Sequence, residues 1–232
     1  MKRKFTLHTI YTLLFLVALT SLNAQITSYP YVADFESDNE GWYSGGSTSW
    51  ERGNPNPTNL LQDAYSSLIC WATNIDGNYS DYENGYIISP EFDFSELIEP
   101  KLEFGLWHHC GDDGDGAVFQ YSIDDGLTWA NVGAFGDENW FNSDYIDSFP
   151  GGQSEGWTKD YENFYYEDYG SGWQLMSHSI TSLAGQTSVS FRLVFTSNSY
   201  SVGEGIAFDL FKVYDDALAY IPDVAFEQYL LD

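Results

Sequence analysis

The sequence predicts an all-β fold, a two-sheet antiparallel jelly-roll sandwich. From residue 25 to about residue 215, short runs of apolar and β-branched residues are separated by turns rich in Gly, Asn, Asp and Ser. Aromatic residues make up 18% of the chain, a composition that suits pleated sheets better than helices. No apolar repeat with helical period is sustained in this stretch. The 232 residues are enough for one such sandwich with a substantial core.

The expected strands follow one another along this stretch. The run 189–195 alternates apolar and polar residues, as a half-buried strand does. The predicted strands are 48–52, 67–73, 85–89, 101–109, 117–123, 128–132, 173–179, 187–197 and 205–214. Their length and turn spacing favour two packed sheets over a single open one.

The first 24 residues predict a cleaved signal peptide. Lys2, Arg3 and Lys4 form a basic head, an apolar run covers 11–22, and small residues around Ala24 resemble a cleavage site. The run is too short to span a bilayer, so a membrane anchor is the weaker alternative. We therefore expect the chain to be secreted or held at the cell surface.

The charge balance restricts the partners. Eight Lys and Arg face 35 Asp and Glu, which gives a net charge of −27. A field of that sign repels nucleic acid and anionic membranes. It favours divalent cations such as Ca²⁺, although acids also keep an exported protein soluble.

The two cysteines, Cys70 and Cys110, each lie in an expected strand. Export to an oxidising compartment favours a disulfide between them over two buried thiols. His108 and His109 beside Cys110 suggest zinc at first sight. Adjacent strand residues point to opposite faces, and no second ligand pair follows at zinc spacing, so we reject a zinc site.

A long acidic and aromatic insertion covers residues 135–172 and includes Trp140, Trp157 and Tyr165. Long ordered loops are often functional, and exposed aromatic rings stack on sugars. The alternative is that these rings pack over a sheet edge. The sequence leaves both open.

The C-terminal segment, 217–232, stands apart from the sandwich. Pro222 suits a first helical turn, and Phe226 and Leu230 recur at helical spacing. The segment resembles the opening of bacterial leucine-rich repeat regions, which implies the cap of a truncated C-terminal module. The alternative is a terminal helix that docks on the sandwich.

Several separated motifs occur in a fixed order. They are Ala33-Asp-Phe-Glu36, Trp50-Glu-Arg-Gly53, Trp71-Ala-Thr-Asn-Ile-Asp-Gly-Asn-Tyr79, Tyr86-Ile-Ile-Ser-Pro-Glu-Phe-Asp-Phe-Ser95, Leu102-Glu-Phe104, Tyr121-Ser-Ile-Asp-Asp-Gly-Leu-Thr-Trp129, Leu183-Ala-Gly185, Val189-Ser-Phe-Arg-Leu-Val-Phe195 and Gly205-Ile-Ala-Phe-Asp-Leu-Phe-Lys-Val213. Together they resemble the MAM-like domains of secreted multidomain proteins of the Bacteroidetes type. The resemblance covers roughly residues 30–215, within a domain expected at 25–216. It implies a concanavalin-like or laminin-G-like sandwich with a non-catalytic adhesive or accessory role.

A calcium site is expected where the chain ends meet. The first and last strands of a jelly roll commonly lie side by side, which would bring Asp34 and Glu36 close to Asp209. Carboxylates held close together repel each other unless a cation neutralises them. The resemblance implies the same role for Glu36 and Asp209. Asp34 would join them only if the strand is regular.

Two acidic turns are interpreted as structural. The run Gly111 to Gly116 lacks the distal Glu of an EF-hand, so we interpret it as a tight turn, with a second cation as the minor alternative. Residues 122–129 match the Asp-box pattern Ser-x-Asp-x-Gly-x-Thr-Trp. There Asp124 would bond turn amides, Gly126 would take a positive φ, and Trp129 would pack under the turn.

The sequence offers little to catalysis. His108, His109 and His178 lack a nucleophile elbow, and neither a His-Glu-x-x-His motif nor a phosphate-binding glycine loop is present. We therefore expect a non-enzymatic module without a nucleotide cofactor, which binds a protein or glycan on a surface. The alternatives, in order, are a carbohydrate-binding module that uses Trp140, Trp157 and Tyr165, and a glycoside hydrolase.

Overall fold

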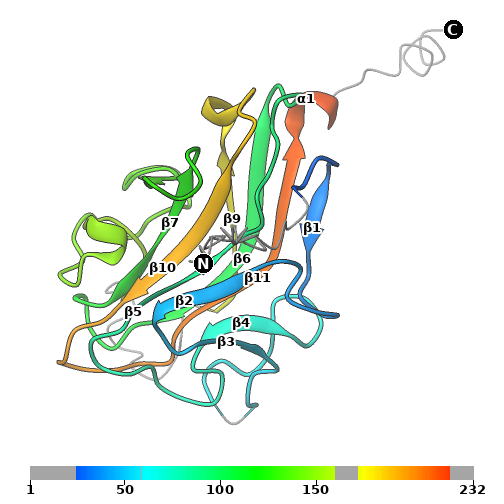
Figure 1. Ribbon diagram of the computed structural model, residues 1–232. Coiled ribbons are helices and arrows are strands. Elements are labelled where there is room, and N and C mark those ends of the chain that lie inside the picture. The colour runs from blue at the N-terminus through cyan, green and yellow to red at the C-terminus, as the bar shows by residue number, and fades with distance from the viewer. Residues whose placement is uncertain (1–24, 58, 160–171, 220–232) are drawn as a thin grey trace, which may run out of the picture.

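The computed structural model describes residues 25–57, 59–159 and 172–219, which form two packed antiparallel sheets (Figure 1). One sheet has the order β3-β4-β11-β6-β9, with β1 also paired to β11, and the other has the order β2-β5-β10-β7-β8. Their bounds are Tyr31–Ala33 (β1), Tyr43–Ser47 (β2), Trp50–Gly53 (β3), Cys70–Thr73 (β4), Asn84–Ile88 (β5), Pro100–His109 (β6), Gly116–Ser122 (β7), Ala130–Asn131 (β8), Gln174–Ser179 (β9), Ser190–Thr196 (β10) and Gly205–Asp215 (β11).

Short helical turns complete the described part of the chain. They are η1 at Pro150–Gly152, η2 at Thr181–Leu183 and α1 at Asp216–Ala219. Within these ranges, no helix has the length and apolar character needed to cross a membrane. The expected signal peptide (1–24) lies outside the described residues, as does most of the expected repeat cap (220–232).

The two-sheet prediction is confirmed, and each of the nine expected strands has a counterpart. The sequence predicted no strand at β2, an edge strand that contains Gly45 and Gly46 and carries no buried residue. It also placed no strand at Tyr31–Ala33, the three-residue β1. Both strands form because they hydrogen-bond to a neighbouring strand, β1 to β11 and β2 to β5, and not because their own residues favour a strand.

The core between the sheets is made of phenylalanine rings. Phe104 on β6 contacts Phe119 on β7 and Phe208 on β11, with ring centroids 4.9 and 5.1 Å apart. Phe191 on β10 stacks on Phe119 at 5.7 Å and contacts Phe211 on β11 at 5.8 Å. All five side chains are fully buried. Strand β10 alternates as expected, with Phe191, Leu193 and Phe195 directed into this core.

A β-bulge interrupts strand β11. The pairing with β6 shifts between Asp209 and Lys212, and Leu210 has a positive φ of 50°. The extra residue lets both Phe208 and Phe211 face the core although they are three positions apart. Asp209, next to the bulge, is thereby left on the side of the sheet away from the phenylalanine core.

We expect Phe208→Ala to lower the free energy of unfolding by about 3–5 kcal/mol, because it empties the space between the two sheets. Urea unfolding measures this directly. The matched control is Leu175→Ala on the edge strand β9, where the side chain is 51% exposed, and its effect should stay within about 0.5 kcal/mol. Equal destabilisation by both variants would contradict this account of the core.

Candidate functional site

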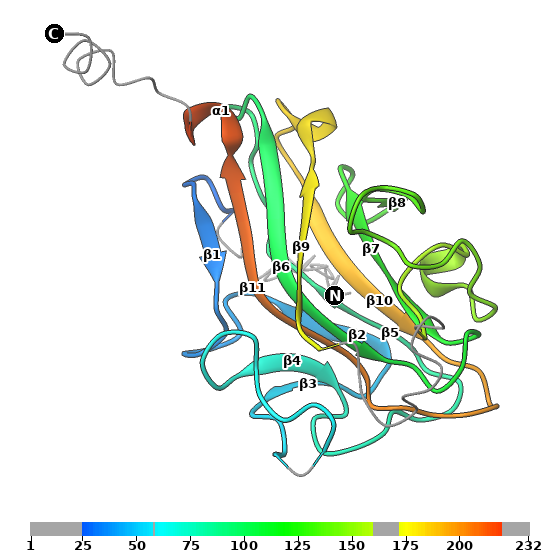
Figure 2. The ribbon, with the colours of Figure 1, turned by 180° about the vertical axis from the view of Figure 1, so that it is seen from behind.

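The two ends of the described domain meet, as expected. Strand β1 pairs antiparallel with β11, and Tyr31 lies opposite Val213 while Ala33 lies opposite Phe211. Figure 2 shows β1 beside β11 at one side of the sandwich. This seam brings the acidic residues that follow β1 close to the bulge of β11.

Asp209 is a buried carboxylate at this seam, with no exposed surface. The backbone N–H groups of Ser66 and Leu210 each donate to it at 2.6 Å, and the Ser66 hydroxyl lies within 3.2 Å of both carboxylate oxygens. Burial raises the pKa of Asp209 to about 6, and the nearby charge of Glu36 acts in the same direction. The two predicted carboxylates therefore do lie close enough to interact.

Glu36 holds the same loop from the other side. The backbone N–H groups of Leu68 and Ile69 donate to its Oε1 at 2.9 and 2.8 Å. Within the described residues, its Oε2 accepts no hydrogen bond. Residues 66–69 are thus fixed between the two carboxylates, and one oxygen of Glu36 remains available to a cation or water.

Asp34 does not join this pair. Phe35 has a positive φ of 59°, so the regular strand ends at Ala33. The Asp34 side chain accepts a hydrogen bond from the backbone N–H of Glu36 and also lies beside the carboxyl of Glu40. Throughout the three described ranges, no three His, Cys, Asp or Glu side chains gather as a metal-ligand group. The expected set of three carboxylates is therefore wrong, and the pair Glu36 and Asp209 remains.

The expected disulfide is also wrong. Cys70 and Cys110 are both buried and free. Cys110 packs in the core between the sheets, whereas Cys70 packs in a second cluster with Leu61 and Trp107. Because the two thiols lie in different hydrophobic clusters, each acts as a small apolar side chain.

The insertion buries the tryptophans that were expected to bind sugar. Trp140 and Trp157 are 4% and 1% exposed, and both contact Phe104 of the core. The indole N–H of Trp140 donates to the Val132 carbonyl oxygen, and that of Trp157 donates to the Trp140 carbonyl oxygen. A sugar cannot stack on rings that are already covered, so this prediction is wrong for both residues. Tyr165, the third expected residue, lies outside the described residues.

The backbone explains why these two rings turn inward. Trp157 pairs with Ala117 of β7, so residue 157 extends the five-stranded sheet at one point. Trp140 packs against His178 of β9 on the other sheet, at 4.8 Å between ring centroids. The described part of the insertion therefore packs across the open side of the sandwich, which was the alternative interpretation.

The Asp box has the expected structure. The Thr128 backbone N–H and hydroxyl and the Ser122 hydroxyl all donate to the Asp124 carboxylate. Gly126 has a φ of +80°, and the Trp129 indole N–H donates to its carbonyl oxygen at 3.0 Å. This turn fixes the Trp129 ring at the end of β7.

Arg192, which was not among the predicted site residues, packs its guanidinium over the Trp129 ring. Its guanidinium carbon lies 4.2 Å from the centre of Trp129. Its Nε and one terminal nitrogen donate to Gln120 Oε1 at 2.9 and 2.6 Å. The alternation of β10 predicts that Arg192 points away from the core, but no sequence signal places it over Trp129.

Asp115 is the structural centre of the acidic turn at 111–116. It has no exposed surface, and it accepts hydrogen bonds from the Tyr79 hydroxyl and from the Asn198 backbone N–H. The Thr158 hydroxyl donates to its carbonyl oxygen. Asp115 therefore joins four segments at one end of the sandwich, which supports the interpretation of this run as a structural turn.

Burial raises the pKa of Asp115 to about 6. An acid whose pKa is higher in the folded than in the unfolded state binds more protons when folded, so its contribution to stability grows as pH falls through about 6. We expect Asp115→Asn to remove this contribution.

Urea unfolding at about pH 7 and about pH 5, with a chelator present, measures the effect. Wild type should gain more stability on acidification than Asp115→Asn does. Asp209 has a similarly raised pKa and contributes equally to both proteins. Asp113→Asn, on an exposed neighbour, should behave as wild type. The same pH dependence in Asp115→Asn and wild type would contradict the prediction.

The chain matches no family model, and the expected kinship with MAM-like domains stays a prediction. Over 91 residues it is 34% identical to Bacillopeptidase F of Bacillus subtilis (strain 168), a match that covers 38% of this chain and 6% of that protein. The chain thus spans a small fraction of this curated relative.

Among solved structures, the fold is similar to the K1 cleaved adhesin domain of Lys-gingipain from Porphyromonas gingivalis W83. That match has a TM-score of 0.44 and 15% identity, and it covers 80% of this chain and 98% of the domain. The CBM22-1 xylan-binding domain of Paenibacillus barcinonensis Xyn10C matches with a TM-score of 0.43 and 12% identity, over 82% of this chain and 96% of that domain.

Proposed function

We propose that this chain is a non-catalytic, extracellular binding module that attaches to a protein or glycan on a surface and is stabilised by calcium at its seam. The observation that supports binding is the number of large aromatic side chains that are exposed to solvent, two of them on loops fixed by hydrogen bonds. Tyr82 and Tyr200 are 71% and 91% exposed, and Tyr145 and Phe149 are also exposed. Exposed aromatic residues of this kind are typical of recognition surfaces.

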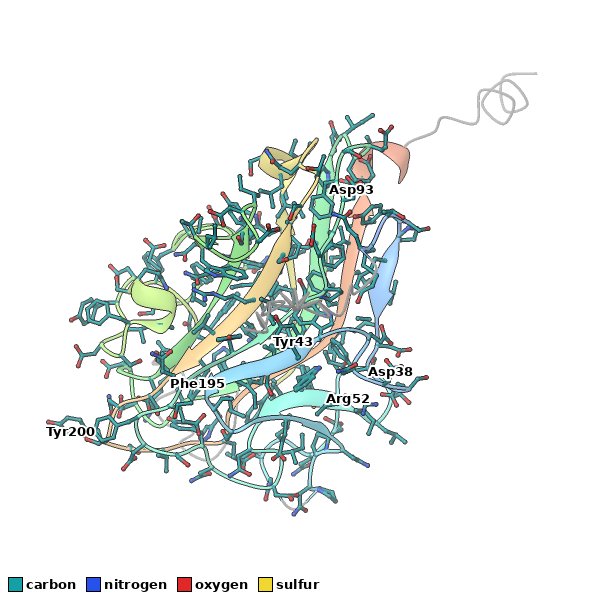
Figure 3. The ribbon with its side chains drawn as sticks, viewed as in Figure 1. Asp38, Tyr43, Arg52, Asp93, Phe195 and Tyr200 are labelled. Carbon is teal, nitrogen blue, oxygen red and sulfur yellow. The ribbon has the colours of Figure 1, made fainter. Side chains whose placement is uncertain are left out.

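The loops that carry two of these aromatics are held by hydrogen bonds. The Tyr82 backbone N–H donates to the Asn198 carbonyl oxygen, and the Tyr200 backbone N–H donates to the Asn198 side chain at 2.7 Å. Asn198 is in turn tied to Asp115. Figure 3 shows Tyr200 at the far tip of the loop between β10 and β11. Loops fixed in this way lose little conformational entropy on binding, which favours affinity.

Purified protein tests the proposal directly. In a solid-phase assay it should bind at least one immobilised surface protein or polysaccharide and should release no reducing sugar or peptide from it. Tyr200→Ser with Tyr82→Ser serves to locate any contact with protein partners. Turnover of a substrate would contradict the non-catalytic role, and the absence of binding to either class would contradict the binding role.

The calcium proposal rests on the seam. Asp209 and Glu36 lie close together, the Asp209 pKa is raised by burial, and Glu36 Oε2 accepts no bond from the described residues. Two neighbouring carboxylates that are buried in part are costly as anions unless a cation neutralises them. A calcium ion here would take further oxygen ligands from backbone carbonyls and water.

We expect calcium to raise the melting temperature of wild type by about 5 °C or more when its concentration exceeds the dissociation constant about a hundredfold. A chelator should reverse the shift. Asp209→Asn and Glu36→Gln should each remove the calcium response, while the exposed Asp113→Asn keeps it. Differential scanning calorimetry with and without chelator measures all four proteins, and a wild-type melting temperature that ignores calcium would remove the site.

A further inference from the structure

One face of the five-stranded sheet points away from the phenylalanine core and presents a row of side chains. The pairing registers place Tyr43, Ile88, Arg192, Gln120 and Asn131 opposite one another, one from each strand. They belong to the same face because neighbouring residues of β10, such as Phe191 and Leu193, point inward. The 150–153 segment covers one end of the row, because Gln120 is 2% exposed beneath Gly151 and the Asn131 amide donates to Gln153. The open part, from Tyr43 to Arg192, crosses three strands and is about 10 Å long at a strand spacing of about 4.8 Å.

Two tyrosines form one end of this face. Tyr43 is 50% exposed and lies on the edge strand β2, near the front of the molecule in Figure 3. Tyr86, on the adjacent β5, lies across Gly45 of β2. A side chain at Gly45 would meet the Tyr86 hydroxyl and ring atoms at 2.7–2.9 Å. Glycine at this position therefore permits the Tyr86 ring to lie over the neighbouring strand.

Next to these tyrosines, the face carries a fixed cation on the middle strand β10 and an indole. Arg192 lies 4.2 Å above the Trp129 ring and 6.0 Å from the centre of Tyr86. Gln120 holds the guanidinium, and the Asp box holds Trp129. The groups of this face thus have set positions before any ligand arrives, so little ordering is required on binding.

The chemistry of the face selects its partner. Aromatic rings offer flat apolar surfaces to the C–H groups of sugars, while Arg192 and the tyrosine hydroxyls can bond sugar hydroxyls. The row contains one aliphatic side chain, Ile88, and Val118 and Val194 of the next row are buried, so an apolar helix finds no continuous stripe. The net charge of −27 repels polyanions despite the single Arg192.

We propose that this face, defined by Tyr43, Tyr86, Arg192 and Trp129, binds an extended neutral polysaccharide that lies across the strands. The inference deepens the proposed binding function and rests on it. It replaces the buried Trp140 and Trp157 with a different set of aromatic residues on the outer side of the sheet.

Affinity electrophoresis of the full chain in gels that contain arabinoxylan, β-1,4-galactan, mannan, starch or hydroxyethylcellulose tests the proposal. Wild type should be retarded by at least one of these neutral polymers. Tyr43→Ala and Tyr86→Ala should each weaken the binding by about tenfold or more, the effect of removing an aromatic anchor. Tyr86→Phe keeps the ring and should retain most of the affinity. Leu175→Ala, on the edge strand of the other sheet, should bind as wild type does.

Thermal melting of each variant separates lost binding from lost folding, and the exposed Tyr43→Ala carries the test if Tyr86→Ala does not fold. No retardation by any neutral polymer would overturn the proposal, as would equal retardation of wild type and both alanine variants. Retardation by polygalacturonate or heparin alone would also overturn it. The solid-phase assay with immobilised proteins tests the broader binding function separately. Protein binding that is unchanged in Tyr86→Ala would support that function even if this face binds no polysaccharide.

Discussion

The hydrogen bonding of strand β11 is the constraint on which the rest of the structure depends. This strand pairs with β1, β4 and β6, and so it fixes the register of most of the six-stranded sheet. Its bulge at Leu210 directs Phe208 and Phe211 into the core and leaves Asp209 on the opposite side. A strand without the extra residue would turn one of these two phenylalanines outward, because side chains alternate with a period of two.

Burial separates the aromatic residues that hold the fold from those that remain available to a partner. Trp140 and Trp157 carry indole N–H groups that bond backbone carbonyls, and their rings continue the phenylalanine core. Tyr43 and Tyr86 lie on the outer face of a sheet whose inner face is already packed. Aromatic side chains therefore stabilise the core in one place and stay available to the proposed ligand in the other, and the difference follows from which side of a strand they occupy.

Carboxylates hold two loop segments of this protein by accepting hydrogen bonds from backbone N–H groups. Asp209 and Glu36 hold residues 66–69 through backbone N–H groups, and Glu204 holds Leu60 and Leu61 in the same way. With 35 acids and eight bases, the chain has few cations to spare for ion pairs. Backbone amides satisfy these carboxylates instead, because an unpaired buried charge is costly.

The sequence by itself determined the class of fold, the positions of nine strands, the alternation of β10 and the Asp-box turn, since each depends on local periodicity or turn chemistry. It also placed Glu36 near Asp209, because adjacent terminal strands are a property of the predicted topology. Only the tertiary structure decided that Asp34 turns aside at Phe35, that Cys70 and Cys110 pack in separate clusters, and that the insertion tryptophans are covered. These outcomes depend on contacts between segments far apart in the chain, and so does the position of Arg192 over Trp129. No local pattern encodes such contacts.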